Sequence, residues 1–159
     1  MGLKWSIENI QGWETRYAAV LRWRDRVRGC IRENGGVSAD SEDFILAFFI
    51  FCFSLCDFVK STGGVSGADM KKLVDDNKFM RICRDICNRS KHYKITPPHQ
   101  PSIDATWSLG REYVPPDGYK NFLIVGGDKL DPVDVVHGCV AFWDQLIATG
   151  QVAKAPAPF

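Results

Sequence analysis

The pattern of hydrophobic and polar positions predicts helices through the first half of the chain. Between residues 13 and 34, apolar side chains recur at spacings of three, four and seven, which places them on one side of a helix. Asn34-Gly35-Gly36 ends this segment. A second helix is expected to begin after Asp40 or Ser41 and to run to Val59, with apolar residues on nearly every face. A helix of that kind is surrounded by others, so it is expected at the centre of a helical bundle.

Two more helices are expected between residues 66 and 96. Ser66 or Gly67 begins a short polar helix, and a longer helix begins near Asn77 with an apolar stripe facing the core. The run Thr96-Pro97-Pro98-His99-Gln100-Pro101 cannot continue a helix, because proline lacks the backbone donor and clashes with the preceding turn.

The pattern then changes to alternation, which is typical of a half-buried strand. Apolar residues alternate with polar ones over residues 103–109, a turn follows at residues 115–118, and Tyr119 to Val125 is rich in aromatic and β-branched residues. Asp131-Pro132 then forms a strong helix start, with an acidic cap before a proline in the first turn. This last helix is expected to end near Ala148.

Together these elements predict a mainly α fold: an up-and-down bundle of four to five helices with a β-hairpin inserted before the last helix. The hairpin falls at about residues 102–126. The length of 159 residues is typical of one domain, and we expect that domain to span residues 1–150, followed by a flexible tail at residues 151–159.

Net charge and the lack of targeting segments limit the partners and the cellular compartment that we expect for this protein. Twenty basic and nineteen acidic residues give a net charge of +1, which excludes a polybasic coat or an acidic tail. The N-terminal stretch lacks the uninterrupted apolar core of a secretory signal. The most apolar segment, Phe44 to Val59, is shorter than the roughly twenty residues of a membrane span and contains Asp57. We therefore expect a cytoplasmic protein with reduced thiols and no membrane association.

The stretch from Arg81 to His92 carries the strongest candidate chemistry. Successive helical residues are rotated by about 100°, so one face is expected to hold Arg81, Arg84, Asp85, Asn88 and His92, with Arg89 and Lys91 beside it. Guanidinium groups bind phosphate, and an imidazole with a nearby carboxylate can move a proton. The alternative is a solvated helix face held by ordinary ion pairs one turn apart.

Paired cysteines suggest a different kind of site. Cys52 and Cys56 are spaced four apart on one helix, and Cys83 and Cys87 are spaced four apart on another, so four thiols could converge on zinc or an iron–sulfur cluster. Cysteine is also among the most buried residue types and packs as a small apolar side chain. We expect core thiols with no metal and no cofactor. Cys30 and Cys139 are expected in the core, and nothing in their spacing argues for a partner.

The first helix is rich in arginine and could form an RNA-binding face. Its six arginines scatter around the helix axis instead of forming one stripe, which favours a solvated, salt-bridged helix. They are Arg16, Arg22, Arg24, Arg26, Arg28 and Arg32.

The aromatic, cysteine-containing segment from Phe48 to Phe58, followed by the Arg-Asp-x-x-Asn-x-x-Lys-His segment that begins at Arg84, resembles HEPN-like helical bundles of small bacterial and phage proteins. The resemblance covers roughly residues 40–145. It implies a helical fold, a homodimer, and a nucleic-acid-binding or nucleotide-binding domain with metal-independent ribonuclease activity. It also implies a setting such as a toxin–antitoxin or phage-defence system.

The resemblance implies a role for each residue of the charged stretch. Arg84 would hold the scissile phosphate, His92 would act as general acid or base, and Asp85 and Asn88 would orient the imidazole or bind the ribose. The interval from Arg84 to His92 is one residue longer than the usual limit of the family motif. Substrate contacts would come from Arg81, Arg89 and Lys91. The alternative is a non-catalytic structural or protein-interaction module.

Overall fold

The structure, a computed structural model, describes residues 12–33, 39–91 and 107–154. These residues form a mainly helical bundle with a small antiparallel sheet before the last helix, which confirms the predicted fold class. The elements follow the chain in the order α1 (Gly12–Arg28), the π-helix η2 (Gly29–Glu33), α2 (Ala39–Thr62), α3 (Gly67–Asp75), α4 (Lys78–Lys91), β1 (Trp107–Val114), β2 (Gly118–Val125), β3 (Asp128–Leu130) and α5 (Pro132–Ala148).

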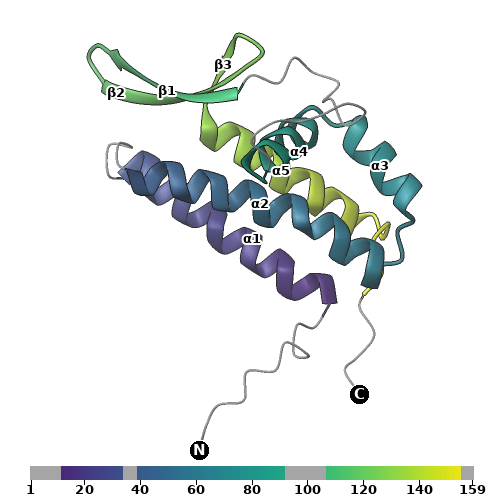
Figure 1. The fold of residues 1–159 in the computed structure, drawn as a ribbon. Coiled ribbons are helices and arrows are strands. Elements are labelled where there is room, and N and C mark those ends of the chain that lie inside the picture. The colour runs from purple at the N-terminus through teal and green to yellow at the C-terminus, as the bar shows by residue number, and fades with distance from the viewer. Residues whose placement is uncertain (1–11, 34–38, 92–106, 155–159) are drawn as a thin grey trace, which may run out of the picture.

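α1 and α2 form an antiparallel pair that runs the length of the bundle (Figure 1). The backbone N–H of Trp13 donates to Thr62 Oγ1 at 3.0 Å, so the start of α1 meets the end of α2. The helix predicted over residues 13–34 changes from α to π geometry at Gly29. The widened turn brings Cys30 Sγ to within 3.0 Å of Ser41 Oγ, near the start of α2.

α2 is the central helix, as its composition predicts. It contacts α1, α3, α4 and α5, and its inward residues include Phe48, Phe49 and Leu55, all fully buried. By length and composition alone, Asp40–Thr62 is the single described helix that could cross a membrane, although 39% of its most apolar window is buried in the bundle. Core helices of soluble proteins also meet this criterion, so the lack of membrane association stays a prediction.

The sheet has one more strand than the predicted hairpin. β1 and β2 pair in antiparallel register from Trp107 opposite Val125 to Val114 opposite Gly118. Gly126 and Gly127 follow β2, and both have positive φ and turn the chain into β3. The sheet lies across one end of the bundle (Figure 1), where the buried Leu123 of β2 joins the hydrophobic core. Residues 102–106 of the predicted hairpin lie outside the described residues.

α5 begins as predicted. The carboxylate of Asp131 accepts a hydrogen bond from the backbone N–H of Val133 at 2.8 Å, and Pro132 occupies the first turn. Further along, Gly138 lies directly against the ring of Phe79 on α4. A β-carbon at position 138 would be only 2.3 Å from that ring, so α4 and α5 approach this closely because residue 138 has no side chain.

The start of the region predicted as a tail is held against the bundle. Val152 is buried, and the backbone N–H of Ala153 donates to Gly63 O at 2.8 Å. The indole N–H of Trp13 donates to Ala153 O at 2.7 Å. These contacts join the beginning of α1, the end of α2 and the segment after α5.

Candidate functional site

The polar side of α4 faces the end of α3, where four residues form a charged cluster. The cluster consists of Asp75, Arg81, Arg84 and Asp85. Arg84 is held between two carboxylates: its Nη1 lies 2.6 Å from Asp75 Oδ1 and its Nε lies 3.2 Å from Asp85 Oδ1. Arg81 Nη1 donates to the backbone oxygen of Asp75 at 2.5 Å. The predicted convergence of Arg81, Arg84 and Asp85 is therefore present, but it is organised around a residue of α3.

Asp85 was expected on the polar face, and the structure buries it. Its relative exposure is 4%, and it lies in a run of α4 that also buries Cys83, Ile86 and Cys87. Burial raises the pKa of Asp85 despite the opposing effect of Arg84. The reading of this residue as part of a solvated face was wrong, because its carboxylate is turned inward to meet the Arg84 guanidinium.

Asp75 has the opposite electrostatic environment. Hydrogen bonds from Lys71 and Arg84 lower its pKa, and Lys71 Nζ lies 2.6 Å from Asp75 Oδ2. The two carboxylates that hold Arg84 therefore differ, because Asp75 is stabilised in its charged form while Asp85 is partly desolvated. Sequence reasoning did not include Asp75 in the site, although the spacing of Lys71 and Asp75 marks an ion pair one helical turn long.

The other predicted site residues are only partly placed. Asn88 is half-buried and Arg89 is exposed on α4. The side chain of Lys91 and the whole of His92 lie outside the described residues. The proposed catalytic pairing of Arg84 with His92 therefore stays a prediction.

Three of the arginines of α1 contact aromatic rings or a neighbouring carboxylate. The Arg16 guanidinium lies over the rings of Phe51 and Phe58, 4.8 and 4.5 Å from their centroids. Arg26 covers Trp23, and Arg24 pairs with Asp25. These arginines cover aromatic residues and make local ion pairs, which agrees with the reading of a solvated, salt-bridged helix.

A pocket of about 220 Å³ opens between α2, α3 and α4, beside the charged cluster. We call it the α2–α3–α4 pocket. Its apolar surface comes from Phe53, Cys56, Met70 and Val74, and its polar lining comes from Asp57, Lys60, Lys71 and Arg84, with Gly67 at the start of α3. The pocket therefore combines an apolar interior with three cationic side chains and one carboxylate.

The charges around the pocket are fixed by neighbouring carboxylates. Lys60 Nζ lies 2.7 Å from Asp57 Oδ1, and that hydrogen bond raises the pKa of Lys60. Lys71 and Arg84 share Asp75. Of these carboxylates, only that of Asp57 lines the pocket, so the charge facing the pocket is predominantly positive.

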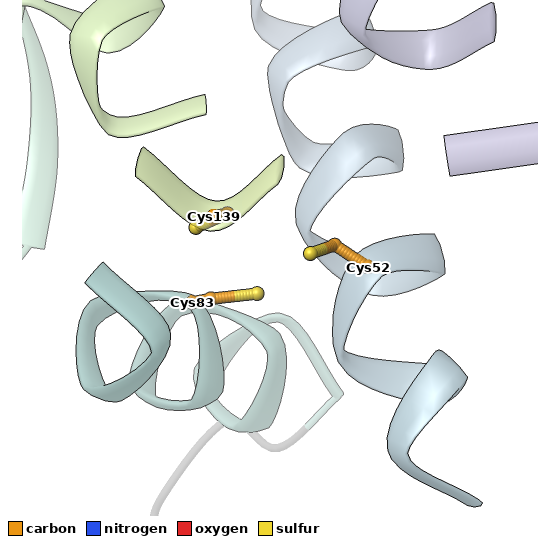
Figure 2. A group of neighbouring side chains, drawn as sticks. All are labelled: Cys52, Cys83 and Cys139. Atoms are coloured by element: carbon orange, nitrogen blue, oxygen red, sulfur yellow. The ribbon is translucent and has the colours of Figure 1, made fainter. Parts of the chain in front are cut away.

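Three cysteines converge, but they are not the four whose spacing raised the possibility of a metal site. The sulfur atoms of Cys52 on α2, Cys83 on α4 and Cys139 on α5 all lie within 4.8 Å of one another (Figure 2). We call these three residues the thiol cluster. Cys56 lines the α2–α3–α4 pocket instead, and Cys87 is buried outside the cluster. Cys139 lies in the core as expected, and the close contact of α5 with α4 brings it to Cys83, a contact for which its spacing in the sequence offered no argument.

The thiol cluster is enclosed in the core, and its members differ in acidity. Each of the three residues has a relative exposure of 0%. Burial raises the pKa of the Cys83 and Cys139 thiols. Burial also opposes ionisation of Cys52, but the two other thiols and the nearby indole of Trp143 favour its charged form more strongly and lower the pKa of Cys52.

No protein-family model matches the chain, and no curated protein or solved structure matches it either. The resemblance to HEPN-like bundles, the expected homodimer and the cytoplasmic setting therefore stay predictions.

Proposed function

We propose that this helical domain binds a nucleotide, or one nucleotide of an RNA strand, in the α2–α3–α4 pocket. The proposal rests on the lining of that pocket, where an apolar interior is bordered by Lys60, Lys71 and Arg84. A nucleotide has matching chemistry, because its base is flat and weakly polar and its phosphate is anionic. Small-molecule sites combine apolar walls with a few placed polar groups in the same way.

The size of the pocket limits what it holds. Ligand pockets typically measure about 300 to 1,000 Å³, whereas this one measures about 220 Å³. A volume of this size suits one base-sized group better than a dinucleotide cofactor. The phosphate would then lie at the rim, near Lys71 and Arg84.

Arg84 is suited to phosphate because its guanidinium is already oriented. Asp75 and Asp85 hold two of its nitrogen atoms, and the side chain is only 19% exposed. A guanidinium fixed in this way loses little conformational entropy when a phosphate binds. The predicted role of Arg84 in phosphate binding is thus retained, with the pocket rather than an open helix face as its setting.

Calorimetric titration tests this function with the four nucleoside 5′-monophosphates and with the matching nucleosides, which lack phosphate. We expect at least one monophosphate to bind more tightly than its nucleoside, and we expect the difference to shrink as salt is added, because the rim is partly exposed. Lys71→Met should weaken binding of that monophosphate about three- to tenfold, since it removes one charged hydrogen bond.

The neighbouring residue Lys72 provides a matched control. It lies on the same helix, its side chain is 79% exposed against 77% for Lys71, and it pairs with Asp76 instead of Asp75. Lys72→Met should leave the affinity unchanged because Lys72 does not line the pocket. Equal losses in the two variants, or no saturable binding of any monophosphate, would show that the pocket does not bind nucleotides.

Ribonuclease activity is a separate extension of this proposal, supported by the HEPN-like resemblance. Cleavage should survive EDTA, leave a 2′,3′-cyclic phosphate and disappear in His92→Ala, while His137→Ala on α5 serves as the control.

The burial of Asp85 and its pairing with Arg84 instead favour the non-catalytic alternative, in which the charged cluster joins α3 to α4. Nucleotide binding without RNA cleavage would support that alternative.

A further inference from the structure

The thiol cluster is separate from the α2–α3–α4 pocket and has its own chemistry. Three sulfur ligands come from three different helices and point into one region of the core (Figure 2). Among the described residues, no fourth His, Cys, Asp or Glu joins the group. The arrangement therefore offers three soft ligands to an ion.

The backbone of the bundle brings these sulfur atoms together. Gly138 lets α5 lie against Phe79, and the adjacent Cys139 donates from its sulfur to Phe79 O at 3.5 Å. Cys83 donates to Phe49 O on α2 at the same distance. Each of these two thiols thus contacts the backbone of a neighbouring helix, so the sulfur positions are set by the packing of α2, α4 and α5.

The spacing of the sulfur atoms suits one ion bound to all three. With metal–sulfur bonds of about 2.3 Å, a planar three-coordinate ion needs sulfur atoms about 4 Å apart, and a pyramidal ion needs them slightly closer. The observed separations are within 4.8 Å. Sulfur atoms this close cannot surround an iron–sulfur cluster, in which each thiolate binds a separate iron.

Charge then distinguishes among the soft ions. Three thiolates with Cu⁺ would bury a net charge of −2, and three thiolates with Zn²⁺ would bury −1. The three thiols have a relative exposure of 0% and lie among the apolar side chains of the hydrophobic core. An uncompensated buried charge is costly. A trivalent ion leaves the site neutral.

We propose that Cys52, Cys83 and Cys139 form a three-thiolate site for a trivalent thiophilic ion, of which arsenic(III) is the representative. At neutral pH this ion is present as uncharged arsenous acid. Three S–H and three As–O bonds break, three As–S bonds form, and the three protons leave with the three hydroxyl groups as water. The step needs no oxidant or reductant and moves no net charge into the core.

One nearby group supports this assignment. The indole N–H of Trp143 is buried and makes no regular hydrogen bond within the described part of the chain, although it lies near Cys52. A sulfur bound to arsenic keeps lone pairs that this N–H can approach.

The test uses the full chain, reduced and then freed of thiol reductant, with sodium arsenite as the probe. We expect native mass spectrometry to show one arsenic per chain with the loss of three protons. X-ray absorption at the arsenic edge should show three sulfur neighbours and no oxygen.

A matched pair of variants identifies the ligands. Cys83 and Cys87 are both buried on α4, but only Cys83 belongs to the thiol cluster. Cys83→Ala should lower the arsenite affinity at least a hundredfold, whereas Cys87→Ala should keep it. Equal affinity in the two variants would overturn the assignment.

Measurements on the unaltered chain keep the proposal testable even if Cys83→Ala fails to fold. An arsenic ion with two sulfur neighbours and one oxygen, or no arsenic bound to the folded chain, would contradict the three-thiolate site. Stoichiometric Cu⁺ or Zn²⁺ held by these three cysteines in preference to arsenite would contradict the charge argument and the choice of a trivalent ion.

Discussion

The charged cluster and the thiol cluster share α4, where Arg84 and Cys83 are adjacent in sequence. The two clusters differ in the charge of their side chains and in their exposure to solvent. In the charged cluster, Arg84 is surrounded by carboxylates that keep its charge balanced near the surface. In the thiol cluster, three thiols are gathered at positions with a relative exposure of 0%. One helix can therefore carry two kinds of polar chemistry because its two sides have very different access to water.

The largest expected effect comes from the inward side of α4. Ile86 is 1% exposed, and Ile86→Ala should lower the free energy of unfolding by about 3 kcal/mol through lost burial and a residual cavity. Arg89→Ala, at an exposed position of the same helix, should change it by no more than about 0.5 kcal/mol. Urea denaturation measures both. Similar losses in the two variants would remove the contrast between the two sides of α4.

Removing the central cation of the charged cluster should have the next largest effect. Arg84→Met leaves the buried carboxylate of Asp85 without its cation and should cost about 2 kcal/mol. The exposed pair of Lys120 and Asp117 on the sheet is the comparison, and Lys120→Met should cost less than about 0.5 kcal/mol. Thermal or urea unfolding measures the loss of stability in each variant. An unchanged free energy of unfolding in Arg84→Met would show that the buried carboxylate of Asp85 does not need the Arg84 guanidinium for stability.

The two carboxylates around Arg84 should respond to pH in opposite directions. The pKa of Asp75 is lowered in the folded chain, so its stabilising contribution is present above its unfolded pKa of about 3.9 and is lost as the pH falls through the folded-state value. The pKa of Asp85 is raised, so its contribution is present below about 3.9 and is lost as the pH rises through the folded-state value.

Urea denaturation at several pH values sharpens this contrast. Between about pH 3 and about pH 7, Asp85→Asn should become more stable relative to the parent chain, while Asp75→Asn should become less stable relative to it. A shared direction for both variants would mean that the two carboxylates titrate in similar environments.

The smallest effect on stability is expected at the rim of the pocket. Lys71→Met should change the free energy of unfolding by no more than about 0.5 kcal/mol, because its ion pair with Asp75 is exposed. Its expected effect on nucleotide affinity is larger. Circular dichroism and calorimetry on one preparation separate the two quantities, and a large loss of stability would assign Lys71 to the fold rather than to binding.

Features that depend on near neighbours in sequence were predictable. The capped start of α5 at Asp131 and its end at Ala148 follow from local rules, and the structure confirms them. The ion pair of Lys71 with Asp75 lies within one helical turn. The place of α2 at the centre of the bundle follows from its apolar composition.

Features that depend on how helices meet were not predictable. The pairing of Cys139 with Cys83 requires the close contact of α5 with α4, for which the sequence offers only Gly138 as a signal. The inward turn of Asp85 likewise depends on Arg84 being held from the other side by Asp75, a residue of a different helix. The resemblance to HEPN-like bundles implied site roles for residues of the stretch that forms α4 and for none of the residues of α3.

The contact between Gly138 and Phe79 has a consequence for how this sequence can change over time. Any side chain at position 138 would overlap the Phe79 ring, so the two positions are coupled. A related chain with alanine or serine at position 138 should carry a smaller residue than phenylalanine at position 79, and an enlarged residue at 79 should occur only with glycine at 138. If arsenic binding is selected for, this coupled pair should vary less in chains that keep all three cysteines than in chains that have lost one.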